Sequence, residues 1–293
     1  MRYEKNILEV LFMKLGVFIN MSEHDHAGVH QPIASIEKEF QKVKDMGIHT
    51  CQLNCWNRSL LNKETAEIVV AASKKVGIEI TSFWCGWDGP GVWDFYEGPV
   101  TLGLVPEAYR QDRLKMLMMG SDFAKMIGVE NLVTHVGFVP EDPNDTKYRG
   151  LVSAIKYLAN YCKENGQCFL FETGQETPVV LLRLFEDIGL DNLGINLDPA
   201  NLIIYGKANP VDALDVIGKY VKGVHAKDGV YPTTGKFLGI EVPLGEGKVN
   251  FPRLIERLRE VGYDGPLTIE REISGDQQIQ DILNGKALLE KLI

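Results

Sequence analysis

The chain has 293 residues, 45% hydrophobic and 24% charged, a balance that is typical of globular proteins and excludes collagen-like, coiled-coil and extended disordered chains. Its formal net charge is −9, from 31 basic and 40 acidic residues, and no basic stripe offsets this charge, so no nucleic-acid partner is expected. Five scattered cysteines favour a reducing compartment, and we expect the cytoplasm.

The N-terminal segment contains an apolar stretch that Glu9 and Lys14 interrupt. No cleavage site of small residues follows it, and no apolar run reaches the roughly 18 residues that a membrane-spanning helix needs. We therefore expect neither an export signal nor a membrane partner. Residues 1–12 are predicted to be an N-terminal extension and residues 13–293 a single domain, because no linker or low-complexity tract divides the chain.

Eight short runs of strand-forming residues recur along the chain, each followed by a helical pattern. Strands separated by helices are parallel with right-handed crossovers, and eight such units predict a closed (β/α)8 barrel, the TIM barrel of the α/β class. A doubly wound open sheet is the competing fold, but both of its glycine-rich nucleotide fingerprints are missing from the sequence. The predicted strands are Leu15–Ile19, Thr50–Asn54, Glu79–Phe83, Asn131–His135, Cys168–Glu172, Leu193–Leu197, Gly223–Ala226 and Leu267–Glu270. The predicted helices lie near 33–46, 62–76, 106–127, 145–165, 178–188, 209–219, 250–261 and 276–292.

Polar side chains stand at the ends of the last four predicted strands, where a barrel of this kind has its active site. The strand ends read FLFETGQ with Glu172, INLDPAN with Asp198, GVHAKD with His225 and LTIERE with Glu270. Each carboxylate taken singly is also explained as a helix cap or a surface charge. Together, three carboxylates in one barrel mouth repel one another, and a divalent cation is the simplest compensation. Carboxylate oxygens and one imidazole nitrogen suit Mn²⁺, Mg²⁺ or Co²⁺.

The motifs FETG, NLDPAN, HAKD, LGEGKVNF and TIERE, in this order, resemble the xylose-isomerase-like barrel superfamily of sugar isomerases and epimerases. The resemblance begins at Met13, and it is strongest to the ketose 3-epimerases, such as D-tagatose and D-psicose 3-epimerase. It implies one divalent ion, Mn²⁺ before Mg²⁺, Co²⁺ or Zn²⁺, and a small sugar as substrate, and it leaves a homodimer or homotetramer open. The implied ligands are Glu172, Asp198, His225 and Glu270, with both glutamates also acting as acid and base.

Five further residues are predicted to contact the substrate. Asn201 stands where the epimerases tend to carry a histidine. His135 ends the fourth predicted strand and could bind a substrate hydroxyl or be a structural histidine. Lys227 could neutralise an oxyanion or be a solvated loop lysine. Trp84 and Trp87 follow the third strand, where aromatic rings suit the C–H faces of sugars, although ordinary loop packing also explains them.

The expected chemistry is removal of a proton from a carbon next to a carbonyl, with a metal stabilising the enediolate. Glu172 and Glu270 on opposite faces of the sugar would invert C3, whereas one base on one face would interconvert aldose and ketose. Loss of a β-hydroxyl would give a dehydratase, as in the 2-keto-myo-inositol dehydratases that the sequence also resembles.

Two other functions are compatible with part of the sequence. The endonuclease IV type of repair enzyme belongs to the same superfamily but needs three zinc ions and additional histidine ligands. Here the third strand ends SFWCGW, and Asn201 stands beside the sixth-strand aspartate. A metal-binding barrel without catalysis is the other alternative, and the presence of both Glu172 and Glu270 argues against it.

Overall fold

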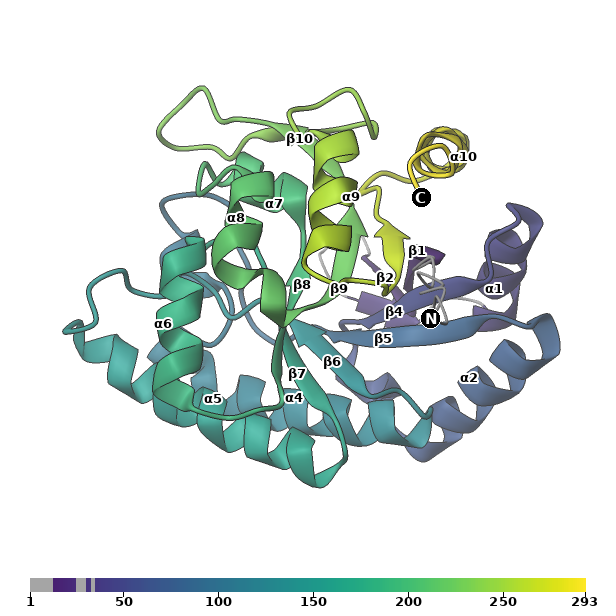
Figure 1. Cartoon of the computed structure of the whole chain (residues 1–293). Helices are drawn as coiled ribbons and strands as arrows, with labels where there is room; N and C mark the ends of the chain where they lie inside the picture. Colours follow the sequence, from purple (N-terminus) through teal and green to yellow (C-terminus); the bar gives the residue numbers. More distant parts are fainter. Residues whose placement is uncertain (1–12, 25–29, 33–34) are drawn as a thin grey trace, which may run out of the picture.

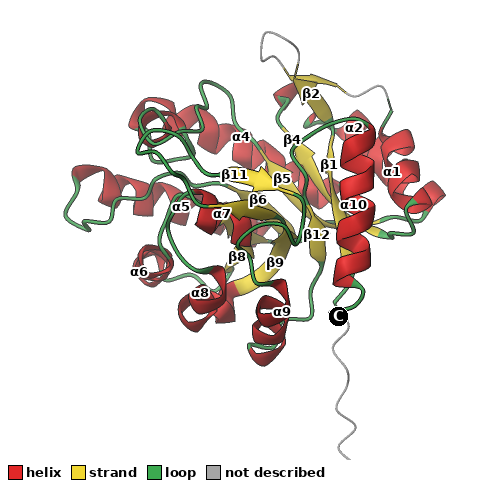
Figure 2. Ribbon diagram, turned by 90° about the horizontal axis from the view of Figure 1, so that it is seen from above, coloured by secondary structure: helices red, strands yellow, loops and turns green. Residues whose placement is uncertain are grey.

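Eight parallel strands close into a barrel in the order β1-β12-β9-β8-β7-β6-β5-β4, and the helices surround it (Figures 1 and 2). The computed structural model of the chain describes residues 13–24, 30–32 and 35–293, so the predicted extension 1–12 lies outside the described residues. The closed barrel of eight parallel strands confirms the predicted fold class. The barrel strands are β1 (Leu15–Asn20), β4 (Thr50–Cys55), β5 (Glu79–Cys85), β6 (Asn131–Thr134), β7 (Cys168–Glu172), β8 (Leu193–Leu197), β9 (Val221–Ala226) and β12 (Leu267–Ile269).

The main helices that follow these strands start and stop within a few residues of the predicted bounds. The first begins later than predicted because Ser35 caps it, its hydroxyl accepting the backbone N–H of Lys38. The helices are α1 (Ile36–Asp45), α2 (Lys63–Val76), α4 (Glu107–Met126), α5 (Thr146–Glu164), α6 (Pro178–Ile188), α8 (Pro210–Ile217), α9 (Phe251–Glu260) and α10 (Asp276–Leu289).

Short elements that the sequence pattern did not reveal stand mostly between the strands and the main helices. Segments of three to six residues carry too little periodicity to be recognised. They are the helices α3 (Gly98–Thr101) and α7 (Pro199–Ile204), the 3₁₀ turns η1 (Arg58–Leu60) and η2 (Gly218–Tyr220), and the hairpins β2 (Ser22–His24) with β3 (His30–Pro32) and β10 (Asp228–Val230) with β11 (Ile240–Val242).

The core lies between the strands and the helices, and the alternation of side chains along each strand decides what enters the barrel interior. On β7, Phe169 and Phe171 join the large apolar core, and Phe171 packs edge-on against Phe185 of α6. Leu170 belongs to a second cluster with Trp84 and others. Glu172 is two residues after Leu170 on the same strand, so its side chain faces the same side and points into the barrel.

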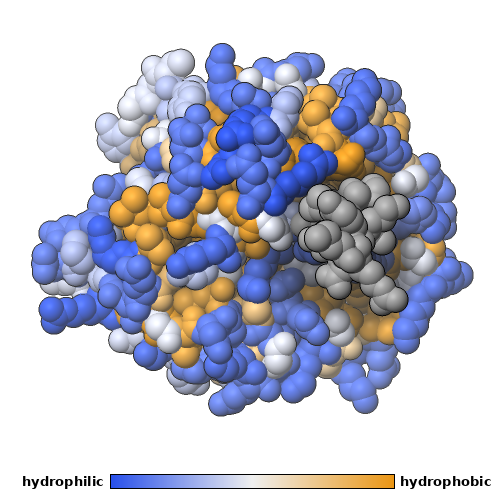
Figure 3. Space-filling model, viewed as in Figure 1, coloured by the Kyte–Doolittle hydropathy of each residue, from blue (hydrophilic) through white to orange (hydrophobic). Residues whose placement is uncertain are grey.

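The molecular surface is mixed in character. Figure 3 shows a largely hydrophilic face on which hydrophobic residues form separate patches. Within the described part of the chain, no helix is long and apolar enough to cross a membrane.

Candidate metal centre and active site

The four predicted ligands come from neighbouring strands, and each occupies an inward-facing position. Glu172 is the last residue of β7, Asp198 directly follows β8, His225 lies within β9, and Glu270 directly follows β12. The residues before Asp198 and Glu270, and those on both sides of His225, belong to the core that the helices cover. All four side chains therefore turn to the barrel interior at the carboxyl ends of the strands.

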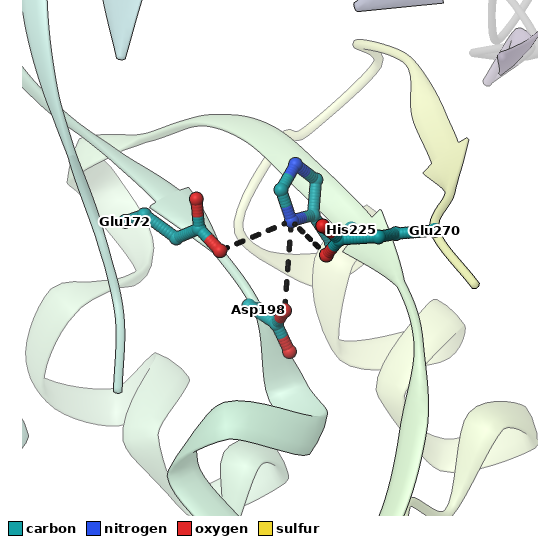
Figure 4. Close-up of side chains that lie close together, drawn as sticks. All are labelled: Glu172, Asp198, His225 and Glu270. Atoms are coloured by element: carbon teal, nitrogen blue, oxygen red, sulfur yellow. Dashed lines mark ion pairs between the residues drawn. The ribbon is translucent and has the colours of Figure 1, made fainter. Parts of the chain in front are cut away.

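The four side chains converge on one point (Figure 4). One potential ligand atom from each lies within 4.8 Å of all the others. His225 Nδ1 is 3.3 Å from Glu172 Oε1, 3.5 Å from Asp198 Oδ2 and 3.0 Å from Glu270 Oε2. Among the described residues, no second group of this kind was found. The geometry matches the predicted set, and the roles of its members remain predictions.

The donor atoms fit a divalent cation. Asp198 Oδ2, His225 Nδ1 and Glu270 Oε2 are buried and take part in no hydrogen bond. Buried polar atoms in proteins are otherwise almost always hydrogen-bonded, so these three atoms at one point indicate a missing partner. Three oxygens and one imidazole nitrogen suit Mn²⁺ or Mg²⁺ better than a soft, thiolate-preferring metal ion.

Asp198 has two functions in the structure. Its Oδ1 accepts the backbone N–H of Asn201 at 2.8 Å and caps α7, in which Pro199 occupies the first turn. Its Oδ2 faces His225. The Thr173 hydroxyl bonds to both the N–H and the carbonyl of Asp198 and holds its backbone in place. Capping a helix and serving as a candidate metal ligand are thus compatible for this residue, because each uses a different carboxylate oxygen.

The charges around His225 favour a proton on its imidazole. Burial alone lowers the pKa of His225, but Glu172 and Glu270 raise it well above its ordinary value. Burial alone raises the pKa of Glu172, but His135, His225 and Lys227 lower it to about 2. A cation at this point would therefore displace a proton from His225, as expected for a histidine ligand.

Lys227 is buried, and the interpretation of this residue as a solvated loop lysine is wrong. Only 2% of the side chain is exposed, and Nζ lies 2.7 Å from Glu272 Oε1, 3.2 Å from Glu270 Oε2 and 3.6 Å from Asp198 Oδ2. The reason is that the chain does not enter a loop after β9 but continues at once into the β10–β11 hairpin. Lys227 therefore places a positive charge next to two of the candidate ligands.

Three of the predicted substrate contacts surround Glu172. Trp84 Nε1 donates a hydrogen bond to Oε2, Asn201 Nδ2 donates to Oε1 at 3.2 Å, and His135 Nε2 lies 3.4 Å from Oε1. Trp87 lies farther back, packed against Trp84 with ring centroids 6.2 Å apart. The structure shows that Trp84, Asn201 and His135 contact the Glu172 carboxylate and that Trp87 contacts Trp84. Direct contact of these residues with a sugar remains a prediction.

The sequence reasoning missed three residues that the structure places around the site. Trp56, just after β4, packs against Trp84 with centroids 5.0 Å apart and against Trp87 at 4.9 Å. Gln52 of β4 contacts His225. Glu176 is buried in the segment that follows β7. The available signal was a polar residue at an inward position of a predicted strand for Gln52 and a second glutamate in FETGQET for Glu176.

Glu176 is expected to make stability depend on pH. It is 1% exposed, neither carboxyl oxygen has a hydrogen-bond partner, and burial raises its pKa to about 8. The folded state therefore keeps a proton that the unfolded chain loses near its ordinary value of 4.5. The contribution of Glu176 to the free energy of unfolding is fully present below pH 4.5 and is lost as the pH rises through 8.

Between pH 5 and pH 8 the wild type should lose stability that Glu176→Gln keeps. The difference in unfolding free energy between the two proteins should therefore shift by about 3 kcal/mol in favour of Glu176→Gln as the pH rises from 5 to 8. Urea unfolding of both proteins with a chelator present measures this difference. Glu186→Gln, at an exposed position of α6, is the matched control and should track the wild type. A constant difference between Glu176→Gln and the wild type across this range would contradict the prediction.

The comparison with known families identifies the barrel. Residues 40–292 match the family described as xylose isomerase-like TIM barrel. The chain belongs to this family. A xylose isomerase domain protein from Planctomyces limnophilus is 34% identical, with a TM-score of 0.84 and 96% of each chain covered. The uncharacterized protein MJ1311 of Methanocaldococcus jannaschii is 30% identical over 176 residues, which span 56% of this chain and 56% of that protein.

Solved structures of lower sequence identity share the barrel fold. A 3-keto-D-glucoside 4-epimerase from E. coli is 20% identical, with a TM-score of 0.68 and coverage of 95% of this chain and 99% of its own. A D-psicose 3-epimerase is 15% identical, with a TM-score of 0.69 and coverage of 96% and 99%. A xylose isomerase-like barrel from Mycobacterium smegmatis, in complex with magnesium, is 18% identical, with a TM-score of 0.68 and 96% of each chain covered. At these identities the likeness shows the fold alone. The family match over residues 40–292 confirms the predicted superfamily.

Proposed function

We propose that this protein is a divalent-metal-dependent sugar epimerase that inverts C3 of a ketose. One observation carries the proposal: Glu172 of β7 and Glu270, just after β12, converge on His225 Nδ1 with Asp198 between them (Figure 4). Inversion of a carbon needs one group that removes a proton from one face and another that returns a proton to the opposite face. Two carboxylates that reach one point from different strands can supply these two groups to a sugar bound between them.

The chain's own residues divide the work. Glu172, Asp198, His225 and Glu270 would hold the metal ion. When bound, the ion supplies positive charge that stabilises the negative charge developing on the substrate oxygens. The glutamate facing the C3 hydrogen accepts this proton, and the other glutamate, in its protonated form, donates a proton from the opposite face. In the reverse reaction the two glutamates exchange these roles.

The surrounding side chains keep the two glutamates in place. Trp84 and Asn201 hold both oxygens of Glu172, and Lys227 lies beside Glu270. The tryptophans Trp84 and Trp87 are buried and exclude water from the Glu172 side of the site. A preorganised pair of carboxylates is what proton transfer at carbon requires.

An exchange assay tests the proposal. The protein is incubated in D₂O with Mn²⁺ and each of a panel of ketoses. The products are separated by chromatography, and their masses are measured by mass spectrometry. We expect the C3 epimer of at least one ketose, carrying one deuterium at C3. An aldose product would indicate isomerisation, and a product lighter by one water would indicate a dehydratase. Either outcome, or no turnover of any ketose, would refute C3 epimerisation.

A further inference from the structure

His225 has a hydrogen-bond partner on the far side of its ring from the candidate metal centre. Its Nε2 lies 2.7 Å from Oε1 of Gln52, a β4 residue that is 1% exposed. Strands β4 and β9 are not neighbours in the barrel, so the contact crosses the barrel interior. A buried amide in the middle of a strand is unfavourable unless its polar atoms are paired.

The orientation of the Gln52 amide is set by two further side chains. Its Nε2 lies 2.7 Å from Ser82 Oγ on β5 and 3.4 Å from Asn196 Oδ1 on β8. In the structure the NH₂ group of Gln52 faces Asn196 Oδ1, an amide oxygen that accepts hydrogen bonds and cannot donate them. Gly223 leaves the space that Asn196 occupies, because a Cβ at position 223 would lie 2.4 Å from Asn196 Oδ1.

This orientation has a consequence for the imidazole. With its NH₂ group on the Asn196 side, Gln52 presents its carbonyl oxygen to His225 and accepts the hydrogen of Nε2. A neutral imidazole carries one N–H and one lone pair, so the lone pair is then on Nδ1. Nδ1 is the ring atom that faces Glu172, Asp198 and Glu270 and has no hydrogen-bond partner.

We propose that Gln52 is a positioning residue that holds His225 with its hydrogen on Nε2, so that Nδ1 is free to bind a divalent cation. The inference rests on the metal centre of the proposed function. Histidine ligands commonly donate their second ring N–H to a carboxylate, a backbone carbonyl or water. Here a side-chain amide takes this part, and Ser82 and Asn196 hold the amide in turn.

The experiment uses the full chain and three variants. Gln52→Met removes the acceptor at nearly unchanged length, and Gln52→Glu keeps an oxygen at the same place. Gln167→Met is the matched control, because Gln167 is also a buried glutamine, 3% exposed, but bonds to Ser121 and the Val129 carbonyl. Mn²⁺ affinity is measured by titration calorimetry, and the His225 tautomer is read from ¹⁵N chemical shifts of the Mg²⁺ complex.

We expect Gln52→Met to bind Mn²⁺ about 10-fold to 100-fold more weakly than the wild type. Gln52→Glu should bind nearly as tightly as the wild type, and Gln167→Met should show wild-type affinity whatever its stability. In the wild-type Mg²⁺ complex, the shifts of His225 should show Nε2 protonated and Nδ1 unprotonated. The wild-type shifts and Gln52→Glu decide the question even where Gln52→Met does not fold.

Wild-type affinity in folded Gln52→Met, weak binding in folded Gln52→Glu, or a proton on Nδ1 in the wild-type Mg²⁺ complex would each overturn the inference. The result is separable from the proposed function. A protein that shows this pattern of affinities but converts no ketose refutes the epimerase and leaves the role of Gln52 standing. A protein that epimerises a ketose with unchanged metal affinity in Gln52→Met refutes the role of Gln52 alone.

Discussion

Glu172→Gln and Glu270→Gln should each lower the turnover number by about 10² to 10⁴, the range that general acid-base groups contribute. Glutamine keeps the size of the side chain and one coordinating oxygen but cannot accept a proton. Both variants should therefore retain part of the Mn²⁺ affinity while losing turnover. Steady-state kinetics at saturating Mn²⁺, with Mn²⁺ titrations beside them, measure the two effects separately.

Isotope exchange sharpens this prediction. In a two-base enzyme, either variant can still exchange the C3 hydrogen with D₂O through its intact glutamate without inverting the carbon. Glu64→Gln, at an exposed position of α2, serves as the control and should behave as the wild type. If both site variants turn over substrate at the wild-type rate, proton transfer by Glu172 and Glu270 is wrong, and these carboxylates serve another chemistry.

Removal of the metal should abolish activity and lower the melting temperature. A ligand that binds only the folded state stabilises it by about 2.7 kcal/mol when its free concentration is 100 times its Kd. Dialysis against a chelator, followed by activity assays and thermal melts with and without added Mn²⁺, measures both effects. Added Mn²⁺ should restore both properties, and a fully active demetallated protein would end the metal-dependent interpretation.

His225→Ala separates metal binding from proton transfer. The variant keeps both glutamates but loses the one nitrogen donor, so it should lose metal before it loses catalytic capacity. We expect a weaker Mn²⁺ affinity and partial recovery of activity at high Mn²⁺, which neither glutamine variant should show. Wild-type Mn²⁺ affinity in His225→Ala would place the ion elsewhere than at this cluster.

The charges around the site explain why a cation and Lys227 can coexist there. Glu172, Asp198 and Glu270 converge on one point, and Glu272 lies beside Lys227. A dication together with the lysine nearly neutralises these four carboxylates, and neither does so alone. The ammonium group lies on the Asp198 and Glu270 side, whereas neutral Trp84 and Asn201 donate to Glu172. The two glutamates therefore sit in different surroundings.

The barrel and the four candidate ligands could be predicted because both depend on local sequence. The strands β7, β8, β9 and β12 are short, mainly apolar runs. At or near their carboxyl ends, each has one polar residue whose side chain faces the barrel interior: Glu172, Asp198, His225 and Glu270. Parallel strands in one barrel bring such positions together wherever the intervening helices lie. Alternation along a strand and the order of the strands are enough to place these side chains in one mouth.

The surroundings of the ligands depend on contacts between residues far apart in the chain. Gln52 and His225 are 173 residues apart, and Trp84 and Glu172 are 88 apart, so no spacing in the sequence links them. Lys227 is buried because the chain after β9 forms a hairpin, and the three-residue strand β10 is too short to show a periodic pattern. Side-chain pairing across the closed barrel, not local propensity, decided which polar groups face the ligands.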